Sequence, residues 1–322
     1  MVFGKCFTVA DLGCSSGTNT LLVASNIIDM ILKTCKEHNL PKPQLQICLN
    51  DLYVNDFNSI LKLLPEFQAN HKKKIGEDFA PCFVSAVPGS FYGRLFPDKS
   101  LNLVYSSYSI HWLSQVPAGL ENNTSNIYIS KTSPPSVFEA YHKQFYDDFM
   151  KFLQMRSKEM VRGGRMALIF IGRSIADPTS DDCCSLLDLL AVSLSDMVKE
   201  GLVRESELNS FNIPVYTPYE DEVRQVIQNE GSFSLDSLSD FRVNWDSHDT
   251  DYINMKDSSA LSDTHGENTA KMIRAVMEPL MTSHFGNSII DVAFKKYAEN
   301  VSKHLVSYKS RHFNLVITLA KK

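Results

Sequence analysis

Several features that would place this chain in a common class of protein are missing from it. No apolar run approaches the roughly 20 residues that a membrane-spanning helix needs, and no signal or transit peptide is recognisable at the start. The seven cysteines contain no CxxC pair, and their odd number argues against a zinc site or a disulfide framework. These absences predict a cytoplasmic protein with no membrane partner.

Motifs of fixed spacing for several reaction classes are missing too. The sequence contains no P-loop, no G-x-S-x-G elbow and no H-E-x-x-H pair, which weakens kinase, hydrolase and zinc-protease interpretations. The net charge is −5 and charges of both signs are mixed along the chain. Because nucleic-acid binding needs a concentrated basic surface, we expect no nucleic-acid partner.

What is present is a chain of 322 residues with 43% hydrophobic content, enough for a large core. Strand-like and helix-like patterns alternate, which predicts an α/β fold: a Rossmann-like, mostly parallel sheet with helices on both faces. The expected strands are 7–12, 45–50, 81–86, 102–106, 165–171 and 312–319, the last returning as an edge or antiparallel strand. The expected helices are 20–36, 55–63, 136–160, 184–200, 219–229, 267–283 and 287–304.

The domain organisation follows from the lengths of these segments. Residues 175–304 are mainly helical and exceed what one βαβ crossover needs. We therefore predict a helical substrate cap there, over the carboxyl ends of the strands, where an open α/β sheet binds its ligand. Residues 1–174 and 305–322 then form the α/β core, and the polar stretch 245–266 is expected to be a loop.

The first candidate site is the loop after the first expected strand. Asp11, Gly13, Cys14 and Asn19 lie in or beside it, and Gly13 stands four residues before Gly17. Glycine lets a backbone approach a ligand closely, but this spacing is not the dinucleotide fingerprint. The loop suits the methionine and ribose parts of S-adenosylmethionine, which has no pyrophosphate to bind. A plain strand-to-helix turn is the alternative.

Two further candidates follow the second and third strands. Asp51 ends the second strand, where a carboxylate can accept hydrogen bonds from both hydroxyls of a ribose. Alternatively, Asp51 or its neighbour Asn50 caps the next helix. Ser90 and Phe91 follow the third strand, and Phe91 either covers an adenine face or packs in the core.

An aromatic segment follows the fourth strand and contains Tyr108, His111 and Trp112. A histidine in such a place can be a general base, and the alternative is a packed aromatic cluster. Trp112 is one of only two tryptophans. Because a buried indole N–H needs an acceptor, a substrate carboxylate would suit it in a charge-assisted hydrogen bond.

Longer blocks of sequence resemble the plant SABATH methyltransferases, the family of the salicylic acid, benzoic acid and theobromine enzymes. The resemblance covers essentially the whole chain, and the blocks occur in the family's order. They are ADLGCSSG at 10–17, LNDL at 49–52, VPGSFYGRLFP at 87–97, SSYSIHWLSQVP at 106–117, GGRM at 163–166, FNIPVYTP at 211–218, EGSF at 230–233 and EPLMTSHFG at 278–286.

The resemblance implies S-adenosylmethionine as methyl donor, and a small acid or a xanthine alkaloid as acceptor, in a homodimeric enzyme. It places cofactor-binding positions at Cys14, Asn19, Asp51, Leu52, Ser90 and Phe91. It places substrate-binding positions at Tyr108, His111, Trp112, Leu187, Tyr216, Ile273 and His312.

Some family members also bind Mg²⁺, which the resemblance would place near Asn123, Phe211 and Asn212. An Asp that is usual among those ligands is Asn209 here. Because Mg²⁺ is a hard cation, the loss of a carboxylate weakens such a site.

Two departures from the family pattern bear on activity. Leu187 stands where salicylate methyltransferases usually have Trp, which predicts a wider pocket for a bulkier or more flexible acid. Family members also usually carry further residues before the first strand, among them a Lys and a Gln that hold the substrate carboxylate. The resemblance therefore implies weak or no turnover for the chain as written.

The function expected from the sequence is methyl transfer from S-adenosylmethionine to the carboxylate of a small plant acid such as benzoate or jasmonate. Tyr108, His111 and Trp112 are the expected catalytic residues. A carboxylate is already ionised at pH 7, so the enzyme has mainly to position it. Two alternatives stay open: N-methylation of a xanthine alkaloid, in which His111 would assist, and an N-terminally truncated product with little activity.

Overall fold

The computed structural model describes residues 5–76, 81–246 and 259–322. Its seven strands form one sheet in the order β3-β2-β1-β4-β5-β7-β6. Strands β1 to β5 run parallel, and β7 is antiparallel to both of its neighbours, β5 and β6. The strands are β1 (Cys6–Leu12), β2 (Gln44–Asp51), β3 (Cys82–Pro88), β4 (Leu101–Ser107), β5 (Met160–Ile171), β6 (Phe233–Asn244) and β7 (Arg311–Lys321).

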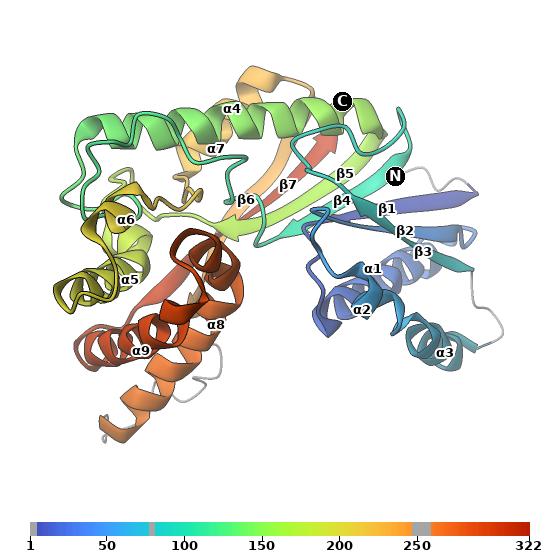
Figure 1. Ribbon diagram of the computed structural model, residues 1–322. Helices are drawn as coiled ribbons and strands as arrows, with labels where there is room; N and C mark the ends of the chain where they lie inside the picture. Colours follow the sequence, from blue (N-terminus) through green and yellow to red (C-terminus); the bar gives the residue numbers. More distant parts are fainter. Residues whose placement is uncertain (1–4, 77–80, 247–258) are drawn as a thin grey trace.

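Helices cover both faces of this sheet, as predicted (Figure 1). In the figure, α1, α2 and α3 lie below the sheet, and α4 and α7 lie above it. Two further groups, α5 with α6 and α8 with α9, lie beyond the carboxyl ends of the parallel strands. The helices are α1 (Thr18–Glu37), α2 (Phe57–Leu61), α3 (Leu64–Ile75), α4 (Pro135–Glu159), α5 (Asp181–Lys199), α6 (Glu205–Ser210), α7 (Glu220–Glu230), α8 (Ser259–Phe285) and α9 (Ile290–Ser307).

Strand β1 illustrates why the sequences of the parallel strands are apolar at nearly every position. Alternate side chains of a strand point to opposite faces, and both faces are covered by helices. Phe7 and Val9 belong to the apolar cluster that contains the buried residues of α1. Ala10 and Leu12 belong to the second cluster, together with the phenylalanines of α4. The strand is thereby fixed between two cores, and the loop after it lies at the carboxyl edge.

Four elements differ from the sequence-based expectation, and one of them is the short helix α6, which was not predicted. Strand β6 was not predicted, because it lies at the edge of the sheet and many of its side chains are exposed, so its apolar alternation is weak. Helix α3 was not predicted either, because Pro65 suggests a break, although proline is tolerated in a first helical turn. Helix α8 begins at Ser259, so the predicted loop was wrong for 259–266. Residues 247–258 of that loop lie outside the described residues.

The boundary between core and cap stays a prediction. Within 175–304, helix α5 packs against α9, and α8 packs against α9, so the four outer helices have contacts of their own. The same range also contains α7, which packs against α4, and β6, which pairs with β7 in the sheet. The helices that lie beyond the strand ends therefore come from two stretches of sequence, 181–210 and 259–307.

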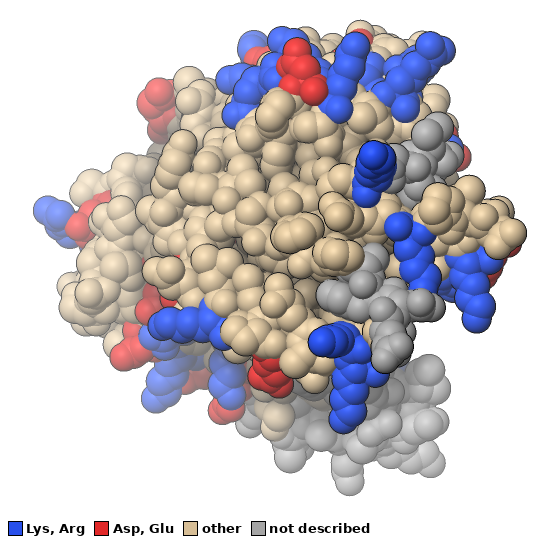
Figure 2. Space-filling model, turned by 90° about the vertical axis from the view of Figure 1, so that its right-hand side faces the viewer, with Lys and Arg blue, Asp and Glu red and all other residues tan. Residues whose placement is uncertain are grey.

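The surface charge, the cysteines and the helix lengths bear on the partners that the sequence excluded. On the face at the amino ends of the parallel strands, Lys and Arg lie around the margin among acidic residues, and the centre is largely uncharged (Figure 2). All seven cysteines are free thiols. In the part of the chain that the structure describes, no helix combines the length and the apolar character needed to cross a bilayer.

Candidate active site

The loop between β1 and α1 is held tightly against the neighbouring strands. The backbone N–H groups of Gly13 and Cys14 both donate to the carbonyl oxygen of Asn50, at 2.9 Å. Gly13 has φ +78°, and a Cβ at this position would lie 2.0 Å from Oγ of Ser109. Only glycine fits both the backbone conformation and the space. The loop can therefore present its backbone to a ligand at close range.

Asp51 lies beside this loop, at the end of β2. Its Oδ2 accepts a hydrogen bond from the N–H of Ser15 at 2.7 Å, and its Oδ1 accepts one from the N–H of Leu52 at 2.8 Å. Helix α2 is capped by Asp56, whose side chain accepts from the N–H of Ser59. Neither Asn50 nor Asp51 is thus the helix cap, and each carboxylate oxygen of Asp51 keeps capacity for a further donor.

The loop after β3 joins the same site. The N–H of Gly89 donates to the carbonyl of Asp51 at 2.8 Å, and the amide of Asn50 donates to the carbonyls of Val87 and Gly89. The Cε1 of Phe91 lies 3.8 Å from the place a Cβ on Gly13 would take. The structure therefore brings Asp11, Gly13, Cys14, Asp51 and Phe91 together, with Ser90 adjacent. Asn19 and Leu52 are exposed, and 51% of Leu52 is accessible to solvent.

The most perturbed acid of the site is Asp11. Burial, with the charge of Asp51 as a second cause, raises the pKa of Asp11 from 3.8 to about 7. The folded protein therefore holds this proton more tightly than the unfolded chain does. Asp11 stabilises the fold when it is protonated, and this contribution decreases as the pH rises from about 4 to about 7.

We expect the substitution Asp11→Asn to remove this pH dependence, because asparagine has the same shape and no charge. The free energy of unfolding of the unmodified protein, relative to that of the variant, should fall by up to about 4 kcal/mol between about pH 4 and about pH 8. Urea unfolding of both proteins at the two pH values measures this difference. A constant difference would contradict the raised pKa of Asp11.

The aromatic segment after β4 is fixed through its backbone. Trp112 forms an isolated antiparallel bridge with Val215, and its carbonyl accepts a hydrogen bond from the hydroxyl of Tyr92 at 2.6 Å. Two residues later, the N–H and the hydroxyl of Ser114 both donate to the buried carboxylate of Asp148 at 2.7 Å. These contacts fix the backbone of Trp112 without using its side chain.

Two aromatic residues of this segment, Trp112 and Tyr108, carry a polar atom at the tip of the side chain. Within the described ranges, no hydrogen bond is made by the indole N–H of Trp112 or by the hydroxyl of Tyr108. Trp112 is half-buried, and Tyr108 is exposed with a positive φ of 55°. A half-buried indole N–H without a partner is suited to an oxygen of a ligand.

His111 lies between these two residues and is held as a neutral imidazole. Burial, with a smaller effect from nearby His312, lowers the pKa of His111 to about 3, and burial lowers that of His312 to about 4. The rings of His111 and Tyr108 meet edge to face, 6.5 Å apart. The backbone N–H of Tyr216 donates to the carbonyl of His111 at 2.8 Å, which ties the two segments together.

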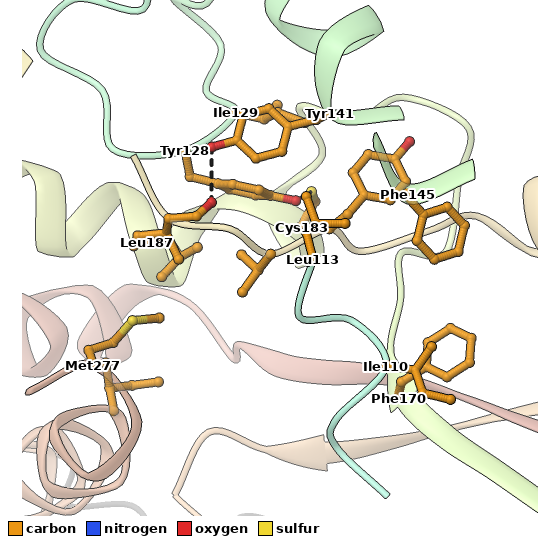
Figure 3. Close-up of a cluster of buried hydrophobic side chains, with 14 of the residues drawn as sticks. Ile110, Leu113, Tyr128, Ile129, Tyr141, Phe145, Phe170, Cys183, Leu187 and Met277 are labelled. Carbon is orange, nitrogen blue, oxygen red and sulfur yellow. Dashed lines mark hydrogen bonds between the residues drawn. The ribbon is translucent and has the colours of Figure 1, made fainter. Parts of the chain in front are cut away.

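Apolar side chains complete this end of the site. Leu187 of α5, Tyr216 and Ile273 of α8 belong to one buried cluster, and Trp112 packs against it. Figure 3 shows part of this cluster, to which β5, α4, α5 and α8 each contribute side chains. The hydroxyl of Tyr216 is occupied by Arg173 and Glu222, so Tyr216 offers its ring and not its hydroxyl.

The residues of the expected magnesium site do not fit the ion. The Oδ1 of Asn123 already accepts hydrogen bonds from Ser133 and Asn126, and its amide N–H donates to Oδ1 of Asn212 at 3.0 Å. The Oδ1 of Asn209 accepts from the N–H of Ser125. Phe211 is buried nearby in the apolar cluster. The group has no carboxylate, and its side-chain oxygens already accept hydrogen bonds from other residues. It is therefore a hydrogen-bonded cluster that does not suit a hard cation.

Sequence analysis did not identify the residues that hold these loops. Asn50 was considered only as a helix cap, and Asp148, Arg156, Glu159 and Arg173 were not considered at all. The sequence did contain a signal for two of these residues, Arg156 and Glu159 on α4. Phe145, Phe149, Phe152, Arg156 and Glu159 are buried at spacings of three and four, so two charges lie on the apolar stripe of the helix.

Comparisons with known proteins identify the family of the chain. The sequence profile of a family described as SAM dependent carboxyl methyltransferase matches residues 2–322. The chain is 46% identical over 320 residues to S-adenosyl-L-methionine:benzoic acid/salicylic acid carboxyl methyltransferase 3 of Petunia hybrida, a match that covers 99% of this chain and 87% of that protein. It is 47% identical over 330 residues to probable jasmonic acid carboxyl methyltransferase 1 of Theobroma cacao, covering 98% and 86%.

A solved structure shows the same fold. The structure of loganic acid methyltransferase with SAH superposes with a TM-score of 0.81 at 29% identity, and the match covers 99% of this chain and 85% of that one.

Proposed function

The chain belongs to the SAM-dependent carboxyl methyltransferases, and from this we propose that it esterifies the carboxylate of a small acid that has a bulky apolar body. The observation that carries the proposal is the half-buried indole N–H of Trp112, which has no partner in the described part of the chain. It lies beside an apolar cluster and at the same edge of the sheet as the loop of Asp51.

At the cofactor end, Asp51 would accept hydrogen bonds from the ribose hydroxyls, and the backbone of Gly13 would lie along the cofactor. S-adenosylmethionine supplies a methyl group on a sulfonium, which a carboxylate oxygen can attack directly. The further side chains that we assign to cofactor binding are Asp11, Cys14, Asn19, Leu52, Ser90 and Phe91. Their support is their position: Asp11 lies near the carboxyl end of β1, and the others lie in the loops after β1, β2 and β3 or at the start of α1.

At the acceptor end, the indole N–H of Trp112 would donate to one carboxylate oxygen, and the other oxygen would face the methyl group. Tyr108 and His111 would bound the carboxylate from the side. A well-positioned intramolecular reaction can gain about 7–11 kcal/mol over the bimolecular one, so positioning suffices as the main contribution.

The body of the acid would lie against Leu187, Tyr216, Ile273 and His312. Leucine leaves more room than tryptophan would, which favours a jasmonate-like acid over salicylate. The relatives named for benzoic, salicylic and jasmonic acid support a small organic acid as the substrate.

N-methylation of a xanthine is less well supported by the site. That reaction must remove a proton from a ring nitrogen, and His111 would have to accept it. Because burial lowers the pKa of His111 to about 3, its imidazole is a weak base. Carboxylate methylation has no such requirement.

A methyl-transfer assay with radiolabelled S-adenosylmethionine tests the proposal. Benzoate, salicylate, jasmonate, indole-3-acetate and a xanthine would be offered separately, and each product treated with mild alkali. We expect label transfer to an acid, released by alkali as methanol, because esters hydrolyse and N-methyl groups do not. Label that resists alkali, or transfer only to the xanthine, would overturn the proposal.

Two further expectations come from the sequence. We propose a homodimer, which rests on the family resemblance, and a cytoplasmic location, which rests on the cysteine usage and on the lack of a long apolar run. Sedimentation velocity of the purified protein tests the first, and imaging of a tagged chain in plant cells tests the second.

A further inference from the structure

A fully buried ion pair lies at the carboxyl end of α4, outside the residues so far assigned to the reaction. The side chains of Arg156 and Glu159 are both 0% exposed, and Nε of Arg156 donates to Oε2 of Glu159 at 2.6 Å. The two remaining ends of the guanidinium donate to backbone carbonyls, Nη1 to that of Phe91 at 2.7 Å and Nη2 to that of Gly93 at 2.8 Å.

The other half of the pair holds the same loop by its amides. Oε1 of Glu159 accepts from the N–H groups of Leu95 at 2.7 Å and Phe96 at 3.1 Å. Arg156 thus donates hydrogen bonds to carbonyls of the loop after β3, and Glu159 accepts hydrogen bonds from N–H groups of the same loop. A buried ion pair contributes little net stability, because desolvation offsets the attraction. What this pair does provide is a single fixed conformation for the loop that carries Phe91.

A second buried arginine holds the opposite part of the site in the same way. Arg173, 2% exposed, follows β5 and pairs with Glu222 of α7. Its Nη1 donates to the carbonyl of Thr217 at 2.6 Å and to the hydroxyl of Tyr216 at 3.2 Å. Glu222 accepts from the same hydroxyl at 3.0 Å and from the N–H of Tyr219 at 2.9 Å.

The two pairs act on different segments. The Arg156 pair contacts the loop 91–96, whereas the Arg173 pair contacts residues 216–219. From Tyr216 one backbone hydrogen bond leads to His111, the neighbour of Trp112. Among the described residues, the two pairs have no hydrogen-bond partner in common, and energetic effects of independent sites add.

We propose that Arg156 and Arg173 are positioning residues, of which Arg156 fixes the loop for the cofactor and Arg173 fixes the segment for the acid. This inference rests on the proposed function. Each arginine acts through the backbone that carries a ligand-binding ring, Phe91 in the first case and Tyr216 in the second.

The test compares Arg156→Lys with Arg173→Lys. Lysine keeps the positive charge beside the glutamate but lacks the fork that reaches two further acceptors. For each variant, calorimetry gives the Kd of S-adenosylhomocysteine, and steady-state kinetics give the KM of the best acid. We expect Arg156→Lys to raise the Kd about ten- to a hundredfold, with the KM of the acid within about twofold of the original value. Arg173→Lys is expected to show the reverse.

The exposed pair of Arg224 and Glu220 on α7 supplies the matched control, since Arg224→Lys also replaces an arginine paired with a glutamate. It should change neither constant. Where Arg156→Lys does not fold, the double variant Arg156→Met/Glu159→Leu removes both buried charges together and is held to the same expectation for the Kd. Equal changes of both constants in both variants, or no change in either, would overturn the proposal.

A different result would refute the proposed function: an unmodified protein that esterifies none of the acids. Binding of S-adenosylhomocysteine still decides the inference in that event. Arg173→Lys should then bind it like the unmodified protein, and Arg156→Lys should bind it more weakly. Any other order of the two variants contradicts the assignment.

Discussion

Replacing Asp51 by alanine is expected to abolish cofactor binding at ordinary concentrations. The substitution removes the carboxylate that would accept hydrogen bonds from the two ribose hydroxyls. It also removes the acceptor of the Ser15 N–H, which lies 2.7 Å away in the unmodified protein. Two charge-assisted hydrogen bonds at about 1.5–3 kcal/mol each correspond to a rise in Kd of about 10²- to 10⁴-fold. Calorimetric titration with S-adenosylhomocysteine measures this change.

Asp56→Ala is the matched control for that experiment. Asp56 is an exposed acid five positions further on, and its side chain caps α2 through the N–H of Ser59. Losing a cap costs about 1 kcal/mol of stability and should leave the Kd for S-adenosylhomocysteine unchanged. Unaltered binding by the Asp51 variant, or equal losses in the two variants, would refute the assignment of Asp51.

Replacing Trp112 by phenylalanine should damage use of the acid and leave the cofactor unaffected. Phenylalanine keeps an aromatic ring in the cluster and removes only the indole N–H, while the backbone bridge to Val215 does not depend on the side chain. The loss of one charge-assisted hydrogen bond predicts a KM for the acid that is higher by about ten- to a hundredfold. Initial rates at saturating S-adenosylmethionine give this value.

The second tryptophan provides a control of the same chemistry. Trp245 is buried and stacks on His304, 5.1 Å between ring centroids, and it does not belong to the residues assigned to the acid. Trp245→Phe should leave the KM of the acid within about twofold of the original value. A Trp112 variant that loses affinity for S-adenosylhomocysteine and for the acid to the same degree would show that Trp112 has only a structural role.

The parallel core of the fold was predictable because burial on both faces leaves a strong pattern. Strand β1 consists almost entirely of buried residues, and the buried side of α1 recurs every three or four positions, from Leu21 to Cys35. Strand β6 carries no such pattern, since among the described strands its one neighbour is β7, and half of its residues are exposed. Its place in the sheet is decided by pairing, which a single sequence does not record.

Sequence analysis could propose site residues where a strand ends in a residue type that suits the chemistry, as at Asp51, or where a rare residue follows a strand, as at Trp112, and their ligand roles stay predictions. It could not propose the residues that hold the site in place, because their partners are backbone atoms far away in the sequence. Arg156 reaches the carbonyl of Phe91 across 65 positions, and Asn50 reaches that of Gly89 across 39. The expected magnesium site came from the family resemblance, whereas the structure shows that the amide of Asn123 donates a hydrogen bond to Oδ1 of Asn212.

The central claim is that Asp51 and Trp112 hold opposite ends of the reacting pair. A crystal structure of the protein with S-adenosylhomocysteine and the best acid tests it most directly. The claim predicts a carboxylate oxygen at about 3 Å from Nε1 of Trp112, and the ribose hydroxyls at hydrogen-bonding distance from Asp51. An acid whose carboxylate points away from Trp112, or a ribose bound elsewhere, would contradict it.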